Sequence, residues 1–370
     1  MGTDAGALRV LHVAHVLDGF EAGGVGAYVR ALTHAQRAAG LVVEAADAGD
    51  LAQPRRGFSA SWERPEVASA LAARVRRDGV RIVHVHHFSQ VGFGIVEAAR
   101  SAGASVVVTV HDHWITCARG QRIDRSGDRC PGPSPGRCAP CVRPDGLPGP
   151  LGRARLRSRL RAAAALRPHL WLTVAPHLGP PGATPCDLPL VQEALPPEPH
   201  DGPVRLLYVG SLIPTKGVDR VVSAFAGLPS GAATLDVVGP AVAWEGSMRF
   251  VDALRAAGIP GLTLHPPGPT APWYARSDVL LFPSRWDEGC PLVLREAAAS
   301  GLTILSSDVP GARVALRGYP VTWVPDEDWL GALAACVPGV ARHEAAVFPT
   351  LAEHVEWLTG QYGRALGASH

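Results

Sequence analysis

The chain has 370 residues, of which 47% are hydrophobic and 18% charged, and its formal net charge is +2. This length allows two or three domains with sizeable cores, and the composition is that of a globular protein. The near-neutral charge gives no reason to expect nucleic acid as a partner. The sequence has no apolar run of about 18 residues, and its first residues lack the features of a secretion signal. We therefore expect a cytoplasmic protein in which thiols mostly stay reduced.

The first half of the chain alternates short apolar runs with longer helical stretches. Strands are predicted at residues 8–16, 81–86, 105–110 and 170–175, and helices at 24–39 and in a segment that ends at 102. This alternation predicts a mostly parallel sheet. Residues 118–150 interrupt it with prolines, glycines and cysteines, and they are too many for an ordinary connection.

Residues 194–203 are rich in proline and form the best candidate for a linker. The alternation then restarts, with strands predicted at 205–209, 233–238, 262–264, 279–282 and 302–305, and helices at 218–226, 248–257 and 292–300. A terminal helix is expected at 354–366. The pattern indicates two α/β domains, residues 1–195 and 204–350, followed by a terminal segment, residues 351–370. Ligands of open α/β sheets bind beyond the carboxyl ends of the strands.

The segment from Pro283 to Glu296 carries the strongest functional signal. Seven residues separate Glu288 from Glu296, and Pro291 precedes a helix-forming run. Because proline suits the first helical position, Glu288 is predicted in a loop facing a helix N-terminus, with Glu296 about one and a half turns inside the helix. Free N–H groups at such an end attract phosphate. One carboxylate on each side could bind the hydroxyls of a sugar and of a ribose, which is the outline of a nucleotide-sugar site.

This segment resembles the Glu-x7-Glu motif of the retaining family-four glycosyltransferases. Residues 23–26, 109–112 and 209–217 match further motifs of that family, in the family's order. The resemblance implies the GT-B fold, an α/β fold of two facing Rossmann-like domains with mostly parallel sheets and an interdomain cleft. The first domain would take the acceptor, the second would bind the nucleotide sugar, and the terminal helix would return to the first domain.

The resemblance also implies roles for individual residues. His111 and Glu288 would act at the donor sugar, Lys216 would bind the diphosphate, and Glu296 would bind the ribose. Further donor contacts are implied for Gly24, Val25, Ser211, Gly289, Cys290 and Leu292. Many family members have arginine where this chain has Ser211, which offers a hydrogen bond but no charge. Arg285, close to the motif, is a candidate to compensate.

Sugar transfer with retention needs stabilisation of the leaving group more than a strong base. The family's proposed mechanism is a front-face transfer, and the alternative is a covalent role for Glu288, as in glycosidases that pair two carboxylates. These motifs imply no catalytic divalent ion. The expected function is transfer of a sugar from a nucleotide diphosphate sugar to a hydroxyl of a glycan, a lipid-linked acceptor or a small molecule. The alternatives are an epimerase or phosphorylase of the same fold, or a donor-binding scaffold without turnover.

Four of the seven cysteines fall in one irregular loop after His111: Cys117, Cys130, Cys138 and Cys141. The Cys138-x-x-Cys141 spacing lets two thiolates reach one tetrahedral zinc ion. A loop without a hydrophobic core of its own would gain from such a clip. Structural zinc, two disulfides, an iron–sulfur cluster and reduced thiols all fit this pattern.

A basic stretch follows the cysteines: Arg153, Arg155, Arg157, Arg159, Arg161 and Arg167. Leu156 and Leu160 would form the buried stripe of its helix. The stretch fits a peripheral contact with an anionic membrane surface or a phosphorylated acceptor, and equally a solvated helix face.

Overall fold

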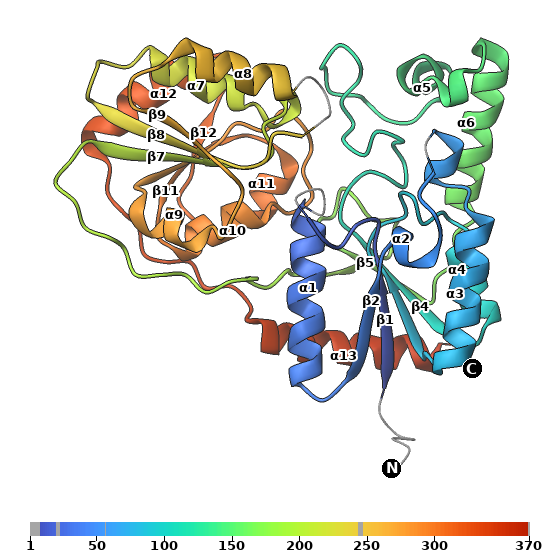
Figure 1. The fold of residues 1–370 in the computed structure, drawn as a ribbon. Helices are drawn as coiled ribbons and strands as arrows, with labels where there is room; N and C mark the ends of the chain where they lie inside the picture. Colours follow the sequence, from blue (N-terminus) through green and yellow to red (C-terminus); the bar gives the residue numbers. More distant parts are fainter. Residues whose placement is uncertain (1–7, 20–22, 56, 243–246, 369–370) are drawn as a thin grey trace. The chain divides into compact units, whose positions relative to one another are not determined.

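The structure, a computed structural model, describes residues 8–19, 23–55, 57–242 and 247–368. The first seven residues, on which the expectation about a secretion signal rests, lie outside this description. The chain divides into two compact units, one formed by Met1–Val191 with Pro349–His370 and the other by Gln192–Phe348 (Figure 1). Within the described residues, each unit contains one sheet of six strands. All the strand pairs are parallel, as the alternation predicted.

The sheet of the first unit has the order β2-β1-β3-β4-β5-β6. Its strands are β1 (Arg9–Val13), β2 (Val42–Ala46), β3 (Ile82–Val85), β4 (Ser105–Val110), β5 (Leu170–Thr173) and β6 (Thr184–Pro185). The helices are α1 (Gly23–Ala38), α2 (Ala48–Leu51), α3 (Pro65–Asp78), α4 (Ile95–Ser101), α5 (Pro135–Val142), α6 (Gly149–Ala164) and α13 (Leu351–Gly367). The terminal helix α13 packs against α1 and β4.

The sheet of the second unit has the order β12-β11-β10-β7-β8-β9. Its strands are β7 (Val204–Val209), β8 (Ala233–Val238), β9 (Leu262–His265), β10 (Val279–Phe282), β11 (Thr303–Ser307) and β12 (Thr322–Val324). The helices are α7 (Val218–Ala226), α8 (Ser247–Ala257), α9 (Ala271–Arg276), α10 (Leu292–Ala299), α11 (Pro310–Ala315) and α12 (Trp329–Cys336).

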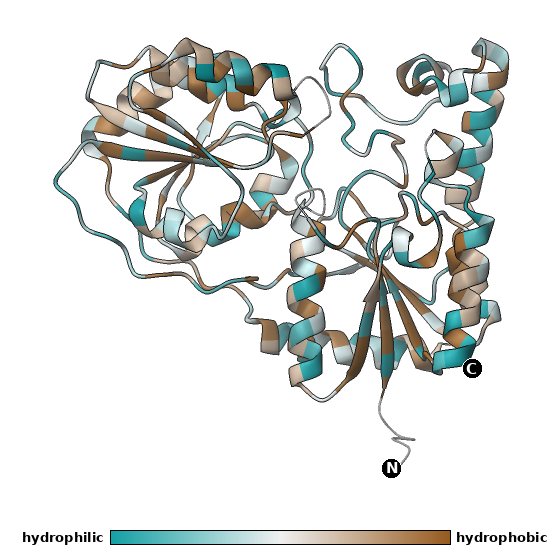
Figure 2. Cartoon of the chain, in the orientation of Figure 1, coloured by the Kyte–Doolittle hydropathy of each residue, from teal (hydrophilic) through white to brown (hydrophobic). Residues whose placement is uncertain are grey.

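Two apolar cores cover the faces of this second sheet. Side chains of α7, α8 and α12 form one core with the sheet, and side chains of α9, α10 and α11 form the other. The strands are correspondingly hydrophobic along their length (Figure 2). Burial on both faces is typical of parallel sheets, and it leaves the carboxyl ends of the strands as the places where polar side chains gather.

The helix that carries Glu296 begins at Leu292, where the predicted helix 292–300 begins, and Pro291 lies just outside it. Pro291 is the N-cap residue of α10, with φ −63° and ψ 117°, and Leu292 is the first helical residue. The extended ψ of Pro291 takes the residue outside the helix, although its φ would suit the first turn. Gly301 ends the segment with φ +73°, as expected for the residue just past a helix.

Gly217 brings two loops of the second unit into backbone contact. It follows the short helix η4 (Pro214–Lys216) with φ +72°. A Cβ atom at this position would lie 2.0 Å from the carbonyl oxygen of Pro283, which directly follows β10. Only glycine permits both this conformation and this approach. The turn that carries Lys216 is therefore held against the end of β10.

We expect Gly217→Ala to destabilise the second unit far more than Gly231→Ala. Both glycines have a left-handed backbone, but a Cβ atom at Gly231 would have no atom within 4 Å. Gly231→Ala, the control, should lose only the roughly 1–2 kcal/mol that a left-handed backbone costs a residue with a side chain. Gly217→Ala should lose more, because its Cβ atom would also clash with the backbone of Pro283. Urea unfolding monitored by circular dichroism measures both losses, and equal losses would contradict the close approach.

Candidate active site

Two residues of the predicted site are in direct contact in the second unit. Lys216 Nζ lies 2.6 Å from Glu288 Oε1, and Ser284 Oγ donates to the same oxygen at 2.9 Å. The Glu288 side chain is only 7% exposed, and that of Lys216 is 25% exposed. The ammonium also lies 5.0 Å from the centre of the Trp286 ring, within range of a cation–π contact. A full positive charge is thus held in place next to a buried carboxylate.

The sheet explains why these residues meet. Lys216 follows β7 and Glu288 follows β10, and these strands are parallel neighbours in the sheet. Their carboxyl ends therefore lie at the same edge, where ligands of such sheets bind. Lys216 is moreover the only lysine in a chain with 35 lysine and arginine residues in total.

The loop between Glu288 and α10 packs closely against the backbone of α11. A Cβ atom at Gly311 would lie 2.2 Å from the carbonyl oxygen of Glu288 and 2.7 Å from that of Gly289. Gly289 is buried, whereas Cys290 and Leu292 are half-buried. Since the N-cap residue of α10 is a proline, its side chain cannot accept a hydrogen bond from the first N–H groups of that helix.

Glu296 belongs to a different hydrogen-bond group from Glu288. It lies in α10, where its Oε2 accepts hydrogen bonds from Tyr274 Oη at 2.8 Å and Thr270 Oγ1 at 3.3 Å. Burial raises the pKa of this carboxyl group, and the hydrogen bond from Tyr274 opposes that shift. Glu288 therefore precedes α10 and Glu296 lies inside it, each with its own protein partners.

Arg285 does not replace the charge that is missing at Ser211. Its two terminal nitrogens donate to both carboxylate oxygens of Asp219, at 2.6 and 2.7 Å. The guanidinium therefore ties the loop after β10 to α7. Ser211 follows β7, and its carbonyl oxygen accepts a hydrogen bond from Tyr208 at 2.9 Å.

The remaining predicted site residues lie in the first unit. His111 directly follows β4, and its Nε2 lies 3.2 Å from Nδ1 of His86. Asp112 turns away from it, since its Oδ2 lies 3.0 Å from His87 Nε2 and its Oδ1 accepts the N–H of Trp114 at 2.8 Å. Burial lowers the pKa of His111 to about 4, so the ring is neutral near pH 7. Asp112 therefore caps the next segment through the N–H of Trp114, and the side chain that contacts the His111 ring is His86.

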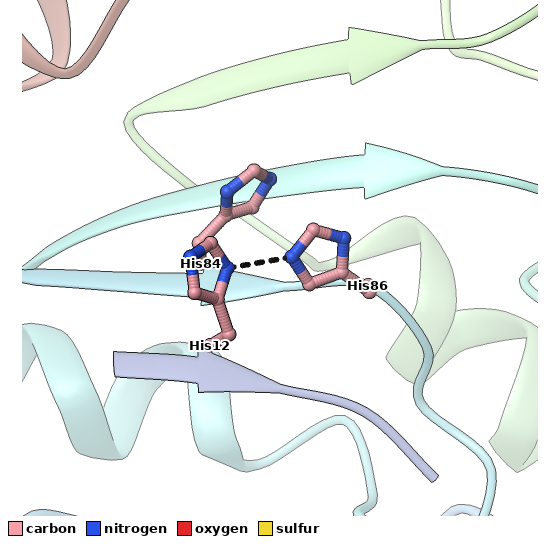
Figure 3. Close-up of side chains that lie close together, drawn as sticks. All are labelled: His12, His84 and His86. Atoms are coloured by element: carbon pink, nitrogen blue, oxygen red, sulfur yellow. Dashed lines mark hydrogen bonds between the residues drawn. The ribbon is translucent and has the colours of Figure 1, made fainter. Parts of the chain in front are cut away.

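His86 belongs to a network of buried polar side chains that we did not predict. His12 Nδ1 lies 2.9 Å from His86 Nε2 (Figure 3). His12 Nε2 lies 2.6 Å from Oε1 of Gln36. All three side chains are almost inaccessible to solvent. The available signal was the presence of histidines in runs that otherwise read as buried strands: His12 in β1, His84 in β3, and His86 directly after β3.

Gly24 and Val25 lie in the first turn of α1, where Gly24 is exposed and Val25 half-buried. The residues just before this helix, 20–22, are outside the described part of the chain. The glycine motif therefore opens the helix, as its sequence suggested.

The four clustered cysteines line one cavity of about 220 Å³. No disulfide bond joins any of these four cysteines in the structure. Two of them, Cys138 and Cys141, lie on α5, and the N–H of Ser134 donates to Cys138 Sγ at 3.3 Å. Among the residues that the structure describes, only His12, His84 and His86 form a group of three whose ligand atoms all lie within 4.8 Å of one another. The four sulfurs thus share a cavity but are more widely spaced than in a closed metal site.

The basic stretch is only partly a solvated face. Arg159 is fully buried in α6, and its guanidinium donates to the carbonyl oxygens of Trp114 and Ile115. Burial lowers the pKa of Arg159 to about 10. Arg155 is also engaged, with Glu63 and with the Trp62 ring. In the described residues no helix combines the length and apolar character that crossing a bilayer requires.

Comparison with known proteins links this site to a family. The family model for group 1 glycosyl transferases matches residues 203–342, most of the second unit. A D-inositol 3-phosphate glycosyltransferase from Rhodococcus erythropolis is 33% identical over 176 residues, which cover 42% of this chain and 39% of that relative. The protein of the same description from Arthrobacter sp. (strain FB24) is 28% identical over 361 residues, covering 85% of this chain and 82% of that relative.

Solved structures resemble the chain over 98% of its length. Sucrose-phosphate synthase from Thermosynechococcus elongatus has a TM-score of 0.63 at 18% identity and is covered to 94%. HepE of Anabaena in complex with UDP-glucose has a TM-score of 0.58 at 12% identity, with 97% covered. The catalytic domain of starch synthase IV from Arabidopsis thaliana, bound to ADP and acarbose, has a TM-score of 0.59 at 13% identity and is covered completely, to 100%.

At these identities the structural likeness establishes the fold, and the expected pair of Rossmann-like domains is confirmed. The match to the group 1 model lies in the second unit, and both relatives are described as glycosyltransferases. The second unit of the chain is thus similar to the group 1 glycosyltransferases, and the chain has the GT-B fold.

Proposed function

We propose that the protein is a retaining glycosyltransferase that moves a sugar from a nucleotide diphosphate sugar to a hydroxyl group. The observation that carries this proposal is the contact between Lys216 and Glu288 beside the N-terminus of α10. Solved proteins of similar fold hold UDP-glucose and ADP, which supports a nucleotide donor. The acceptor class stays open among glycans, lipid-linked sugars and small molecules.

In this proposal the departing diphosphate is stabilised by protein groups. Lys216 supplies a full positive charge, and the first N–H groups of α10 point their dipoles to the same region. The contact of Lys216 with Glu288 uses one of the three ammonium hydrogens, so the other hydrogens could bind the diphosphate. Glu288 would bind hydroxyls of the donor sugar, and Glu296 would bind the ribose. Front-face transfer then requires no protein nucleophile.

We expect Lys216→Met to weaken donor binding about ten- to a hundredfold, since loss of a charge-assisted contact costs roughly 1.5–3 kcal/mol. Methionine keeps the apolar stem of the lysine, so the loss reports on the charge. Glu296→Ala should have a similar effect through the ribose. Isothermal titration calorimetry with UDP, ADP and GDP measures both. Unchanged affinity in both variants would refute the assignment.

The single lysine allows an independent test of the same contact. Reductive methylation modifies amines, so within the chain it should label Lys216 and otherwise only the terminal amine. A nucleoside diphosphate that binds Lys216 should slow labelling there and leave the terminal amine unaffected, as peptide mass spectrometry can show. Equal labelling with and without nucleotide would place the diphosphate elsewhere.

We expect His111→Ala and Glu288→Gln each to lower kcat roughly 10- to 100-fold and to weaken nucleotide binding less than that. The reason is that both residues should act where charge develops in the transition state. Steady-state kinetics with separately measured nucleotide affinities test this. The anomeric configuration of the product, read by NMR, should equal that of the donor. Inversion, or near-normal turnover in either variant, would contradict the proposed roles.

We also propose that the loop 117–141 holds one structural zinc ion through its four cysteines, Cys117, Cys130, Cys138 and Cys141. Their shared cavity and the N–H···S bond to Cys138 support this. With Zn–S bonds of about 2.3 Å, the sulfurs of a tetrahedral site lie about 3.8 Å apart. Because no three of them lie within 4.8 Å of one another in the described chain, zinc binding would have to tighten the loop.

Freshly purified, reduced protein should therefore contain about one zinc per chain, as expected for four thiolate ligands. Cys138→Ser should lose the metal and loosen the loop, as hydrogen exchange can measure. Cys336→Ser is the matched control, since Cys336 lies in α12 of the other unit and should not affect zinc content. Absence of metal from the reduced wild-type protein by elemental analysis would leave disulfides or free thiols.

A further inference from the structure

The amide of Gln36 gives the buried network a direction. Its Nε2 donates to the hydroxyl of Tyr362 at 3.2 Å, and its Oε1 faces His12 Nε2 at 2.6 Å. A carbonyl oxygen only accepts hydrogen bonds, so the proton between these atoms is on His12 Nε2. Gln36 is fully buried on α1, and both ends of its amide are therefore occupied by protein partners.

The donor and acceptor of each following hydrogen bond are then determined, because each histidine is neutral and carries one proton. Burial lowers the pKa of His12 to about 4, and it lowers that of His86 well below its usual range. A neutral imidazole carries one proton, so His12 Nδ1 is an acceptor and His86 Nε2 must donate to it at 2.9 Å. His86 Nδ1 is then in turn an acceptor, and His111 Nε2 must donate to it at 3.2 Å.

We propose that Gln36, His12 and His86 are positioning residues that fix the tautomer of His111. In that tautomer Nε2 carries the proton and donates to His86, and Nδ1 is left as the acceptor for a substrate hydroxyl. Carbohydrate hydroxyls both donate and accept, so this selects which of their hydrogen bonds His111 can make. The substrate part of this inference rests on the proposed sugar transfer, whereas the tautomer itself does not.

The other arm of the network has a direction that agrees. Since Tyr362 accepts from Gln36, its hydroxyl donates to His84 Nδ1 at 2.9 Å. The neutral His84 then carries its proton on Nε2 and donates to Thr109 Oγ1 at 2.7 Å. Tyr362 lies on α13, so this helix contributes to the arrangement in the first unit. If the amide of Gln36 were reversed, every bond in both arms would reverse and His111 would carry its proton on Nδ1.

A metal ion is a less suitable occupant of this cluster. His12, His84 and His86 lie close enough together to ligate one ion (Figure 3). Yet each of their six ring nitrogens already faces a hydrogen-bond partner: Gln36, Tyr362, Thr109, His111, or, between His12 and His86, each other. An ion would have to displace these bonds in a buried site.

The network is also a poor path for protons to solvent. Gln36 joins its two arms through an amide that cannot take up and release a proton at neutral pH, and the second arm leads to the buried Thr109. Such a network can orient His111 but is a poor route for carrying a proton away from it. Orientation of a catalytic histidine by a hydrogen-bonded partner is an effective way to fix its tautomer.

The test is histidine ¹⁵N NMR on the wild-type chain without substrate, with signals assigned through His→Gln variants. Nδ1 and Nε2 have distinct shifts when protonated or bare, so each tautomer is read directly. We expect His12, His86 and His111 to carry their protons on Nε2. A protonated Nδ1 in His111, or a shift pattern that changes on addition of Zn²⁺, would overturn the proposal.

A matched pair of variants tests the transmission. His12→Phe removes the link between Gln36 and His86 and should lead to mixed tautomers of His111, with kcat reduced about tenfold or more and donor KM changed little. Thr109→Val removes the end of the other arm and should leave the tautomer of His111 unchanged. A single unaltered tautomer of His111 in His12→Phe would overturn the proposal. Because the tautomers are read without turnover, failure of the proposed transfer activity would show separately, as a lack of product.

Discussion

A polar group that is buried must find a partner, and this constraint shapes both units where their parallel strands end. In the first unit the partners are neutral: the histidines in β1 and directly after β3 share single protons with Gln36 and His111. In the second unit the partners are charged, with Lys216 and Ser284 both bonded to the buried carboxylate of Glu288. Unpaired, any of these groups would cost several kcal/mol of stability. The hydrogen bonds and the ion pair that offset the cost of burial therefore also fix the positions of these side chains.

Close backbone approach makes the second arrangement possible. Gly217 lets the Lys216 turn approach the end of β10, since a Cβ atom there would lie 2.0 Å from the carbonyl oxygen of Pro283. Gly311 lets α11 approach the loop at Glu288, since a Cβ atom there would lie 2.2 Å from the carbonyl oxygen of Glu288. Each glycine thus removes a side chain at the point where one loop of the site supports another. The geometry of the site depends on these contacts more than on the lengths of the loops.

The apolar pattern sufficed to predict most of the fold, because strands buried on both faces read as continuous runs. The segments 218–226, 233–238 and 279–282 were predicted with their observed bounds. The motif residues could be named from the resemblance, but their partners could not. His86 meets His12 only because β3 lies next to β1 in the sheet, and Arg159 meets the carbonyl of Trp114 across 45 residues. Such pairings depend on topology, which no local pattern specifies.

The choice of lysine at position 216 has a geometric reason. Arg285 shows what a guanidinium does in this loop: its planar donor groups bond both oxygens of Asp219, and one of them also donates to the carbonyl oxygen of Pro214. Lys216 contacts a single oxygen of Glu288, and an ammonium has three hydrogens that rotate about one bond. Its contact with Glu288 uses one of them, so the charge can be held by the protein and still be offered to a diphosphate. In the proposed transfer Lys216 would bind both Glu288 and the diphosphate, and it is the only lysine among the 35 lysine and arginine residues of the chain.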